Sequence, residues 1–184
     1  MRILLFFILI SVFFACNNAP STIDLVKNKE KKIKPKIAET VYPSDMPPVY
    51  EQFDDLAHIF KQQSDTTYII NFWATWCKPC VEELPYFETL TKKYKNSPVK
   101  VILVSLDFKK QLVKKLLPFI KKHQLQSEVL VLTDPDANTW VDKVDPAWSG
   151  AIPVTLIYKQ EQRAFYEEAF EDLAALEKVV EPFL

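Results

Sequence analysis

The most informative segment of the chain runs from Tyr68 to Cys80 and reads YIINFWATWCKPC. Its first half is β-branched and aromatic and carries no charge, which predicts a buried strand. From Pro79 to about Tyr94, apolar side chains recur every three or four positions, which predicts a helix with one buried face. The cysteines Cys77 and Cys80 are therefore expected where a strand ends and a helix begins.

This position should make Cys77 reactive. Free amides and the positive end of the dipole at a helix N-terminus favour an anion, so its thiolate should form more easily than that of an ordinary cysteine. Cys80, one turn later, should be more buried and close enough to form a disulfide with Cys77. Pro79 lacks an amide proton, which is tolerated in a first helical turn. Lys78 adds a cation that should lower the pKa of the Cys77 thiol further.

The same segment resembles the active-site motif of a known family. The residues that carry the resemblance are Asn71, Phe72, Trp73, Ala74, Thr75, Trp76, Cys77, Lys78, Pro79, Cys80, Glu83 and Pro85. They are similar to the thioredoxin superfamily and, with Asn71 and Glu83 included, to its TlpA/ResA-type branch of extracytoplasmic bacterial thiol-disulfide oxidoreductases. The resemblance covers roughly residues 49–184. It implies an enzyme with a redox-active Cys77–Cys80 pair and without a metal or nucleotide cofactor.

The resemblance also implies a mechanism. In the reduced protein, the Cys77 thiolate attacks a partner disulfide, and Cys80 then resolves the mixed disulfide. Plain thioredoxin has a buried aspartate where Asn71 aligns. Because asparagine cannot take a proton, Glu83, about one helical turn past Cys80, is the candidate acid/base residue. The alternative is that Glu83 is a helix-surface carboxylate like Glu82.

A second element of the site is expected near the Ile152–Pro153 step. Gly150 is the only glycine in the chain, which indicates a backbone conformation that other residues resist. The Ile152–Pro153 step resembles the cis-proline element that thioredoxin folds build opposite the cysteines, although an ordinary trans proline at a strand start remains the alternative. Ile152 could pair with an extended substrate segment, and Trp76 would supply a flat apolar wall.

Hydrophobic periodicity predicts alternating strands and helices. The expected strands are 66–74, 99–106, 129–132, 152–158 and 162–170, and the expected helices are 50–63, 79–94, 108–125, 137–144 and 171–184. The fold class is therefore α/β. We expect a thioredoxin-like fold, with a central mixed β-sheet, helices on both faces and an inserted helical segment between the CxxC helix and the cis-proline element. The lysine-rich helix 108–125 could lie on a membrane, but its lysine face is more often a solvated face.

The N-terminal residues predict export. Met1 and Arg2 precede an apolar run that is too short to span a bilayer comfortably, so residues 1–15 are interpreted as a signal peptide. Resemblance to bacterial lipoprotein signals implies that Cys16 becomes the lipidated first residue of the mature chain. Plain secretion with a free Cys16, or an uncleaved anchor, are the alternatives.

The remaining domain boundaries follow from composition. Residues 16–46 are lysine-rich and lack periodicity, so they are predicted to form a lipid-anchored flexible tether, and residues 47–184 to form the thioredoxin-like domain. The chain has three cysteines, so acylation of Cys16 would leave Cys77 and Cys80 as a pair. We therefore expect a membrane-anchored lipoprotein on the extracytoplasmic, periplasmic side.

The expected partners follow from this chemistry. They are a disulfide-containing protein substrate, such as an apocytochrome c in cytochrome c maturation, and a membrane protein that donates reducing equivalents. From Asp45 onward, 16 basic and 21 acidic residues give a net charge of about −5, which gives no support to nucleic-acid binding.

The residues argue against three other functions. A copper or other metal-handling protein would need ligands besides the two thiolates, and His58 and His123 each fall in a predicted helix outside any Cys-His cluster. A thiol peroxidase would use a differently organised cysteine loop. A non-catalytic binding module on the same fold would have no reason to keep two redox-competent sulfurs at this turn.

Overall fold

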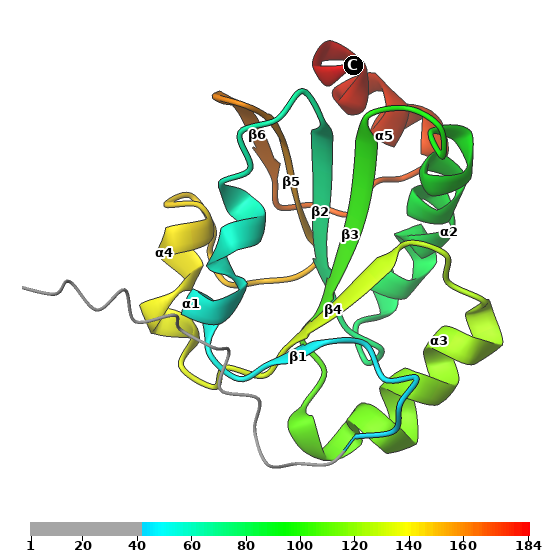
Figure 1. The fold of residues 1–184 in the computed structure, drawn as a ribbon, viewed down its shortest axis with the longest axis vertical. Helices are drawn as coiled ribbons and strands as arrows, with labels where there is room; N and C mark the ends of the chain where they lie inside the picture. Colours follow the sequence, from blue (N-terminus) through cyan, green and yellow to red (C-terminus); the bar gives the residue numbers. More distant parts are fainter. Residues whose placement is uncertain (1–41) are drawn as a thin grey trace, which may run out of the picture. The chain divides into compact units, whose positions relative to one another are not determined.

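A six-stranded sheet organises residues 42–184, the part of the chain that the computed structural model describes (Figure 1). Its strand order is β1-β4-β3-β2-β5-β6. The strands are β1 (Val49–Tyr50), β2 (Thr67–Trp73), β3 (Val99–Ser105), β4 (Glu128–Leu132), β5 (Val154–Lys159) and β6 (Gln162–Tyr166). Strands β1 to β4 are parallel to one another, whereas β5 runs antiparallel to β2, and β6 runs antiparallel to β5. The sheet is therefore mixed, as predicted.

Several expectations concern residues outside this range. The signal peptide 1–15, the lipidated Cys16 and most of the tether 16–46 lie outside the described residues, so they remain predictions. Among residues 42–184, no helix has the length and apolar character that crossing a membrane requires.

Helices cover both faces of the sheet (Figure 1). One face carries α2 (Lys78–Lys93), α3 (Leu117–His123) and α5 (Leu173–Val180), and the other carries α1 (Phe53–Leu56) and α4 (Val141–Val144). Each face has its own hydrophobic cluster, which agrees with the α/β class that the sequence predicts.

Strand β2 lies in the interior of the sheet and is hydrogen-bonded on both sides, to β3 and to β5. Its side chains alternate between the two clusters, so that Ile69 and Trp73 pack under α2 while Ile70 and Phe72 pack under α1 and α4. Burial on both faces explains why this strand reads as a continuous apolar run.

The helix expected over residues 50–63 is wrong in extent. Residues Val49–Tyr50 form the edge strand β1, and α1 covers only Phe53–Leu56 before a 3-10 turn at Ala57–Phe60. The edge strand forms because the amides of Val131 and Thr133 donate to the carbonyls of Pro48 and Tyr50. Two residues are too few for a period-2 pattern to appear in the sequence.

The helix expected over 108–125 is divided. It begins with a 3-10 turn at Lys109–Gln111, continues as a π-helical turn at Leu112–Leu116, and becomes α-helical only in α3. Pro118 lies in the first turn of α3, where its missing amide proton is tolerated. The proline therefore marks the boundary between the two helical forms.

The core around β2 should depend strongly on Phe72, which is fully buried and packs its ring 4.8 Å from that of Trp148 and 6.1 Å from that of Phe60. Phe72→Ala should lower the free energy of unfolding by about 3 to 5 kcal/mol, measured by urea denaturation. Val113→Ala, at an exposed apolar residue, should change it by no more than about 0.5 kcal/mol. Equal losses in the two variants would contradict this assignment of the core.

Candidate functional site

A disulfide joins Cys77 and Cys80 at the start of α2. The two sulfur atoms are 2.01 Å apart and the two Cα atoms 5.3 Å apart. Cys77 is the N-cap residue, and its Sγ accepts a hydrogen bond from the amide of Cys80 at 3.3 Å. An amide that donates to this sulfur in the disulfide would also stabilise a thiolate on it.

The two cysteines differ in access. Cys80 has no exposed surface, and Cys77 is 7% exposed. Pro79 lies between them in the first turn of α2, where no intrahelical partner for its nitrogen is needed. Cys77 is therefore the more accessible of the two residues.

The segment before β5 lies against the disulfide. The Ile152–Pro153 peptide bond is cis, as the resemblance to thioredoxin folds implies, and the carbonyl oxygen of Ile152 lies 3.7 Å from the Sγ of Cys77. Gly150 has φ of +92°, and a Cβ there would meet no atom within 4 Å, so the backbone conformation rather than crowding favours glycine. Within residues 42–184, the amide and carbonyl of Ile152 form no backbone hydrogen bond. They are free to pair with another chain.

Glu83 is buried one turn after Cys80 and is only 1% exposed. Its Oε1 accepts a hydrogen bond from Nδ2 of Asn71 at 2.9 Å, and its Oε2 accepts one from the amide of Phe170 at 2.9 Å. Burial raises the pKa of Glu83 to about 7, while the hydrogen bonds from Phe170 and Asn71 oppose the rise. Such a carboxyl can gain or lose a proton near neutral pH.

Glu82 provides the contrast. It is exposed and lies 3.5 Å from the ammonium of Lys78, which is exposed as well. Glu83 is therefore not a surface carboxylate like its neighbour. The Lys78 cation pairs with Glu82 in solvent, where charge interactions are weak, so its effect on the Cys77 thiol should be small.

Asn71 connects Glu83 to the sheet. Its Nδ2, which donates to Glu83, also donates to Oγ1 of Thr155 at 3.1 Å and to the carbonyl oxygen of Val154 at 3.4 Å, both on β5. Its Oδ1 is buried and has no hydrogen-bond partner among the described residues. The asparagine thus fixes the carboxyl of α2 against β2 and β5.

A second buried carboxylate, which sequence reasoning did not single out, holds the segment before the cysteines. Asp107 follows β3 and is 1% exposed. Its Oδ2 accepts hydrogen bonds from the amide of Thr75 at 3.0 Å and the hydroxyl of Ser105 at 2.9 Å, and its Oδ1 accepts one from the hydroxyl of Thr75. The available signal was an acidic residue directly after a buried apolar run.

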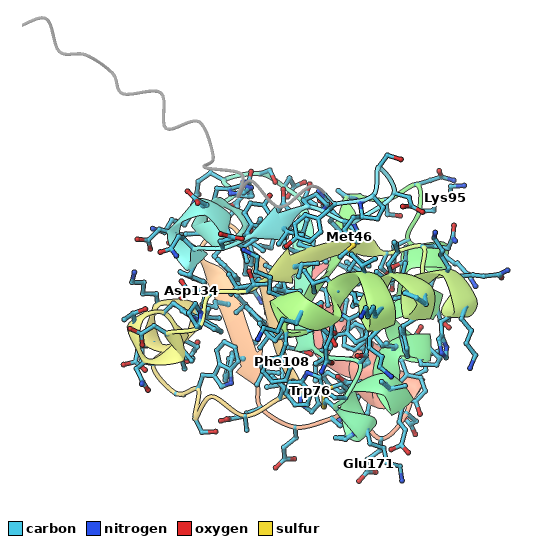
Figure 2. The ribbon with its side chains drawn as sticks, turned by 90° about the horizontal axis from the view of Figure 1, so that it is seen from below. Met46, Trp76, Lys95, Phe108, Asp134 and Glu171 are labelled. Atoms are coloured by element: carbon cyan, nitrogen blue, oxygen red, sulfur yellow. A yellow bond between two sulfur atoms is a disulfide. The ribbon has the colours of Figure 1, made fainter. Side chains whose placement is uncertain are left out.

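Trp76 lies on the surface beside the disulfide. Its side chain is 52% exposed, and its ring stacks on that of Phe108, which is 60% exposed, with centroids 5.7 Å apart (Figure 2). Trp76 was predicted to form an apolar wall, but Phe108 was not predicted beside it, because nothing in a single sequence places these two rings together.

The histidines do not join the cysteines. The Nδ1 of His58 lies 3.0 Å from the carbonyl oxygen of Asp55, and the ring of His123 stacks on Phe119 with centroids 4.1 Å apart. Among residues 42–184, no three histidine, cysteine, aspartate or glutamate side chains are grouped so that they could hold a metal ion.

These features define a class of protein. A CxxC disulfide at the start of a helix, with a cis-proline against it and a mixed sheet behind it, is the arrangement of thioredoxin-like proteins. The profile of the AhpC/TSA family matches residues 48–163, and the chain belongs to this family.

Proteins of similar sequence agree with this class. The thiol-disulfide oxidoreductase ResA of Bacillus cereus is 40% identical over 62 residues, which cover 34% of this chain and 34% of that protein. ResA of Geobacillus kaustophilus is 34% identical over 89 residues, which cover 48% of this chain and 45% of that protein. The chain thus matches about a third of the first relative and less than half of the second.

A solved structure shares the fold. The thioredoxin-related protein of Neisseria meningitidis serogroup B superposes with a TM-score of 0.54 at 21% identity, covering 64% of this chain and 84% of that chain. The fold is therefore that of thioredoxin-like proteins, as predicted.

Burial of Glu83 should make folding stability depend on pH. Its pKa in the folded protein, about 7, lies above the ordinary value of 4.5, so the folded state binds the proton more tightly. The stabilising contribution is complete below pH 4.5 and is lost as the pH rises through 7. Between pH 4.5 and 8, the free energy of unfolding of the wild type should fall by about 2 to 3 kcal/mol. Glu83→Gln has no titrating carboxyl at this position, so its free energy of unfolding should not show this fall.

The measurement is urea denaturation of the disulfide-bonded protein across this pH range. Glu82→Gln is the matched control, because its carboxyl is exposed, and it should reproduce the wild-type profile. Parallel profiles for the wild type and Glu83→Gln would contradict the raised pKa.

The Asp107 network should contribute to stability as well. Asp107→Asn keeps the shape of the side chain but replaces one acceptor oxygen with a donor that faces the donors of Thr75 or Ser105. We expect a loss of about 1 to 3 kcal/mol in the free energy of unfolding. Asp136→Asn, at an exposed turn residue, is the control and should be nearly neutral; an equally neutral Asp107→Asn would rule out this role.

Proposed function

We propose that this protein is a thiol-disulfide oxidoreductase that reduces disulfides of partner proteins through Cys77 and Cys80. The observation that carries the proposal is the Cys77–Cys80 disulfide at the N-terminus of α2, with the more accessible sulfur 3.7 Å from the Ile152 carbonyl oxygen. A buried pair without an accessible sulfur would have been structural only. Here Cys77 can react with a partner, while Cys80 stays buried next to it.

The reaction begins from the reduced protein. The Cys77 thiolate attacks one sulfur of a substrate disulfide, that S–S bond breaks, and one substrate thiolate leaves. Cys77 is then joined to the substrate by a mixed disulfide. The Cys80 thiolate attacks the Cys77 sulfur, releases the second substrate thiolate and forms the Cys77–Cys80 disulfide. The substrate gains two electrons, and it takes up two protons as its thiolates become thiols.

Glu83 is the group suited to move the proton that Cys80 must lose. It shares the buried side of α2 with Cys80, one turn away, and its pKa of about 7 is close to neutrality. In the disulfide-bonded protein its oxygens are held by Asn71 and Phe170. These hydrogen bonds keep the Glu83 carboxyl in one position on the buried side of α2 between successive reactions.

The substrate would be positioned by main-chain pairing. The amide and carbonyl of Ile152 are unpaired within the described residues and lie beside Cys77. An extended substrate segment that pairs with them would bring its disulfide to the Cys77 sulfur. Main-chain pairing of this kind is largely independent of the substrate's sequence.

The direction of electron flow and the location belong to the proposal too. The reductase direction is supported by the similarity to proteins named thiol-disulfide oxidoreductase ResA, together with the TlpA/ResA-type motif. Extracytoplasmic location and anchoring through Cys16 are supported by the composition of residues 1–16. A membrane donor of reducing equivalents and an apocytochrome c substrate would fit this location.

Substitution of each cysteine tests the proposal. The full chain, reduced beforehand, should reduce the disulfides of insulin, and Cys77→Ser should abolish this activity. Cys80→Ser should accumulate a covalent complex with a disulfide-containing partner, detected by non-reducing electrophoresis and mass spectrometry, because the mixed disulfide cannot be resolved. A wild type without exchange activity would refute the enzyme and favour a binding module on the same fold.

A further inference from the structure

The surface around Phe108 carries a feature that the chemistry at the cysteines does not use. We infer that Trp76, Phe108 and the adjoining cavity form a docking surface for an extended segment of the partner protein that has aromatic and acidic residues beside its reactive cysteine. This inference rests on the proposed function and names the substrate class that the site would prefer.

The two stacked rings are the first observation. Trp76 immediately precedes Cys77, and its ring covers one side of Phe108 while both rings remain more than half exposed. Figure 2 shows the two side chains next to each other at the surface. Large exposed apolar side chains are uncommon in the described residues, and these two lie directly beside the reactive sulfur. Grouped apolar exposure of this kind marks interaction sites.

A cavity lies next to the stacked rings of Trp76 and Phe108. It has a volume of about 670 Å³ and lies between the segment that follows β3 and the segment that follows β4. Its largely apolar wall includes Leu106, Phe108, Leu132, Pro135 and Trp140. Phe108 belongs to both the stacked pair and the cavity, so the surface is continuous from Trp76 into the cavity. Crevices at the carboxyl ends of parallel strands are common ligand sites in α/β sheets.

The charges around the cavity indicate what its occupant should carry. The carboxylates of Asp107 and Asp134 that line it already accept hydrogen bonds from the protein, Asp107 from Thr75 and Ser105, and Asp134 from the amides of Phe53 and Asp136. Both carboxylates remain charged, but Asp107 is only 1% exposed and Asp134 is held by two backbone amides.

The lysines on the same segment are available. Lys110 lines the cavity, and neither it nor the exposed Lys114 and Lys115 forms an ion pair within residues 42–184. The apolar wall of the cavity would accept aromatic side chains of a partner, and the unpaired lysines would attract carboxylates that follow them. A basic segment would meet the like charge of Lys110 in the cavity lining.

Such a segment would act together with main-chain pairing at Ile152. The substrate cysteine would lie over Cys77, and the aromatic residue beside it would bury the exposed faces of Trp76 and Phe108. Burial of an aromatic side chain favours the complex without a change in the exchange step. Preference should therefore appear in the second-order rate constant of exchange for segments that carry these residues.

Synthetic peptides provide the test. Three nonapeptides with a central cysteine, DDFSCSFDD, DDSSCSSDD and KKFSCSFKK, are prepared as mixed disulfides with thionitrobenzoate, whose release is followed by absorbance. The reduced wild type should favour DDFSCSFDD about tenfold over each of the other two peptides. Phe108→Ser should bring the aromatic preference close to unity, and Lys110→Glu should do the same for the acidic preference. Val113→Ser, at an exposed apolar residue outside the cavity lining, is the matched control and should keep both preferences.

The possible results separate the inference from the function on which it rests. Equal second-order rate constants for the three peptides, with exchange that Cys77→Ser abolishes, would overturn the docking surface and leave the oxidoreductase intact. A preference that persists in Phe108→Ser would also overturn it. Absence of exchange with every peptide would refute the proposed function itself. A dimer of the full chain that Phe108→Ser dissociates would assign the surface to a second copy instead.

Discussion

The position of β2 between two hydrogen-bonded neighbours is the constraint on which the site depends. The strand pairs along its length with β3 and β5 and packs side chains into both hydrophobic clusters, so it cannot shift without disrupting the core. Helix α2 begins five residues after this strand ends, and Cys77 caps it. The reactive sulfur is therefore placed by the most constrained strand of the sheet. The same sheet brings the Ile152–Pro153 bond to the sulfur, because β5 is paired directly with β2.

Two buried carboxylates support this junction in different ways. The carboxylate oxygens of Asp107 accept hydrogen bonds from the amide and hydroxyl of Thr75 and from the hydroxyl of Ser105. Asp107 therefore anchors the segment that leads to Trp76 and Cys77. Glu83 has fewer donors for the charge it would carry, and burial dominates, which raises its pKa to about 7. One carboxylate is thus suited to holding structure and the other to exchanging a proton. Both are 1% exposed, but Asp107 accepts three hydrogen bonds and Glu83 accepts two.

The elements that sequence reasoning predicted well are those whose side chains repeat regularly over a long stretch. The strand at β2 and the helix at α2 agree with prediction to within about one residue, because burial is continuous in the strand and one-sided in the helix. The two-residue strand β1 was missed, and the helix expected over 108–125 proved to be three kinds of helical turn. Local periodicity cannot show either feature. The first depends on hydrogen bonds from Val131 and Thr133, and in the second Leu112 and Leu116 of the π-helical turn belong to the buried core.

The sequence by itself predicted a cysteine pair between a buried strand and a helix with one buried face, because the CxxC spacing and the strand and helix periods around it are local properties of the chain. It also identified Glu83 as the candidate proton carrier, through the presence of Asn71 where plain thioredoxin has an acid. Only the tertiary structure decided that Asn71 and Phe170 hold that carboxyl, that Asp107 anchors Thr75, and that Phe108 stacks on Trp76. These contacts join residues between 12 and 87 positions apart. Contacts at such separations depend on how strands and helices pack, which no local pattern records.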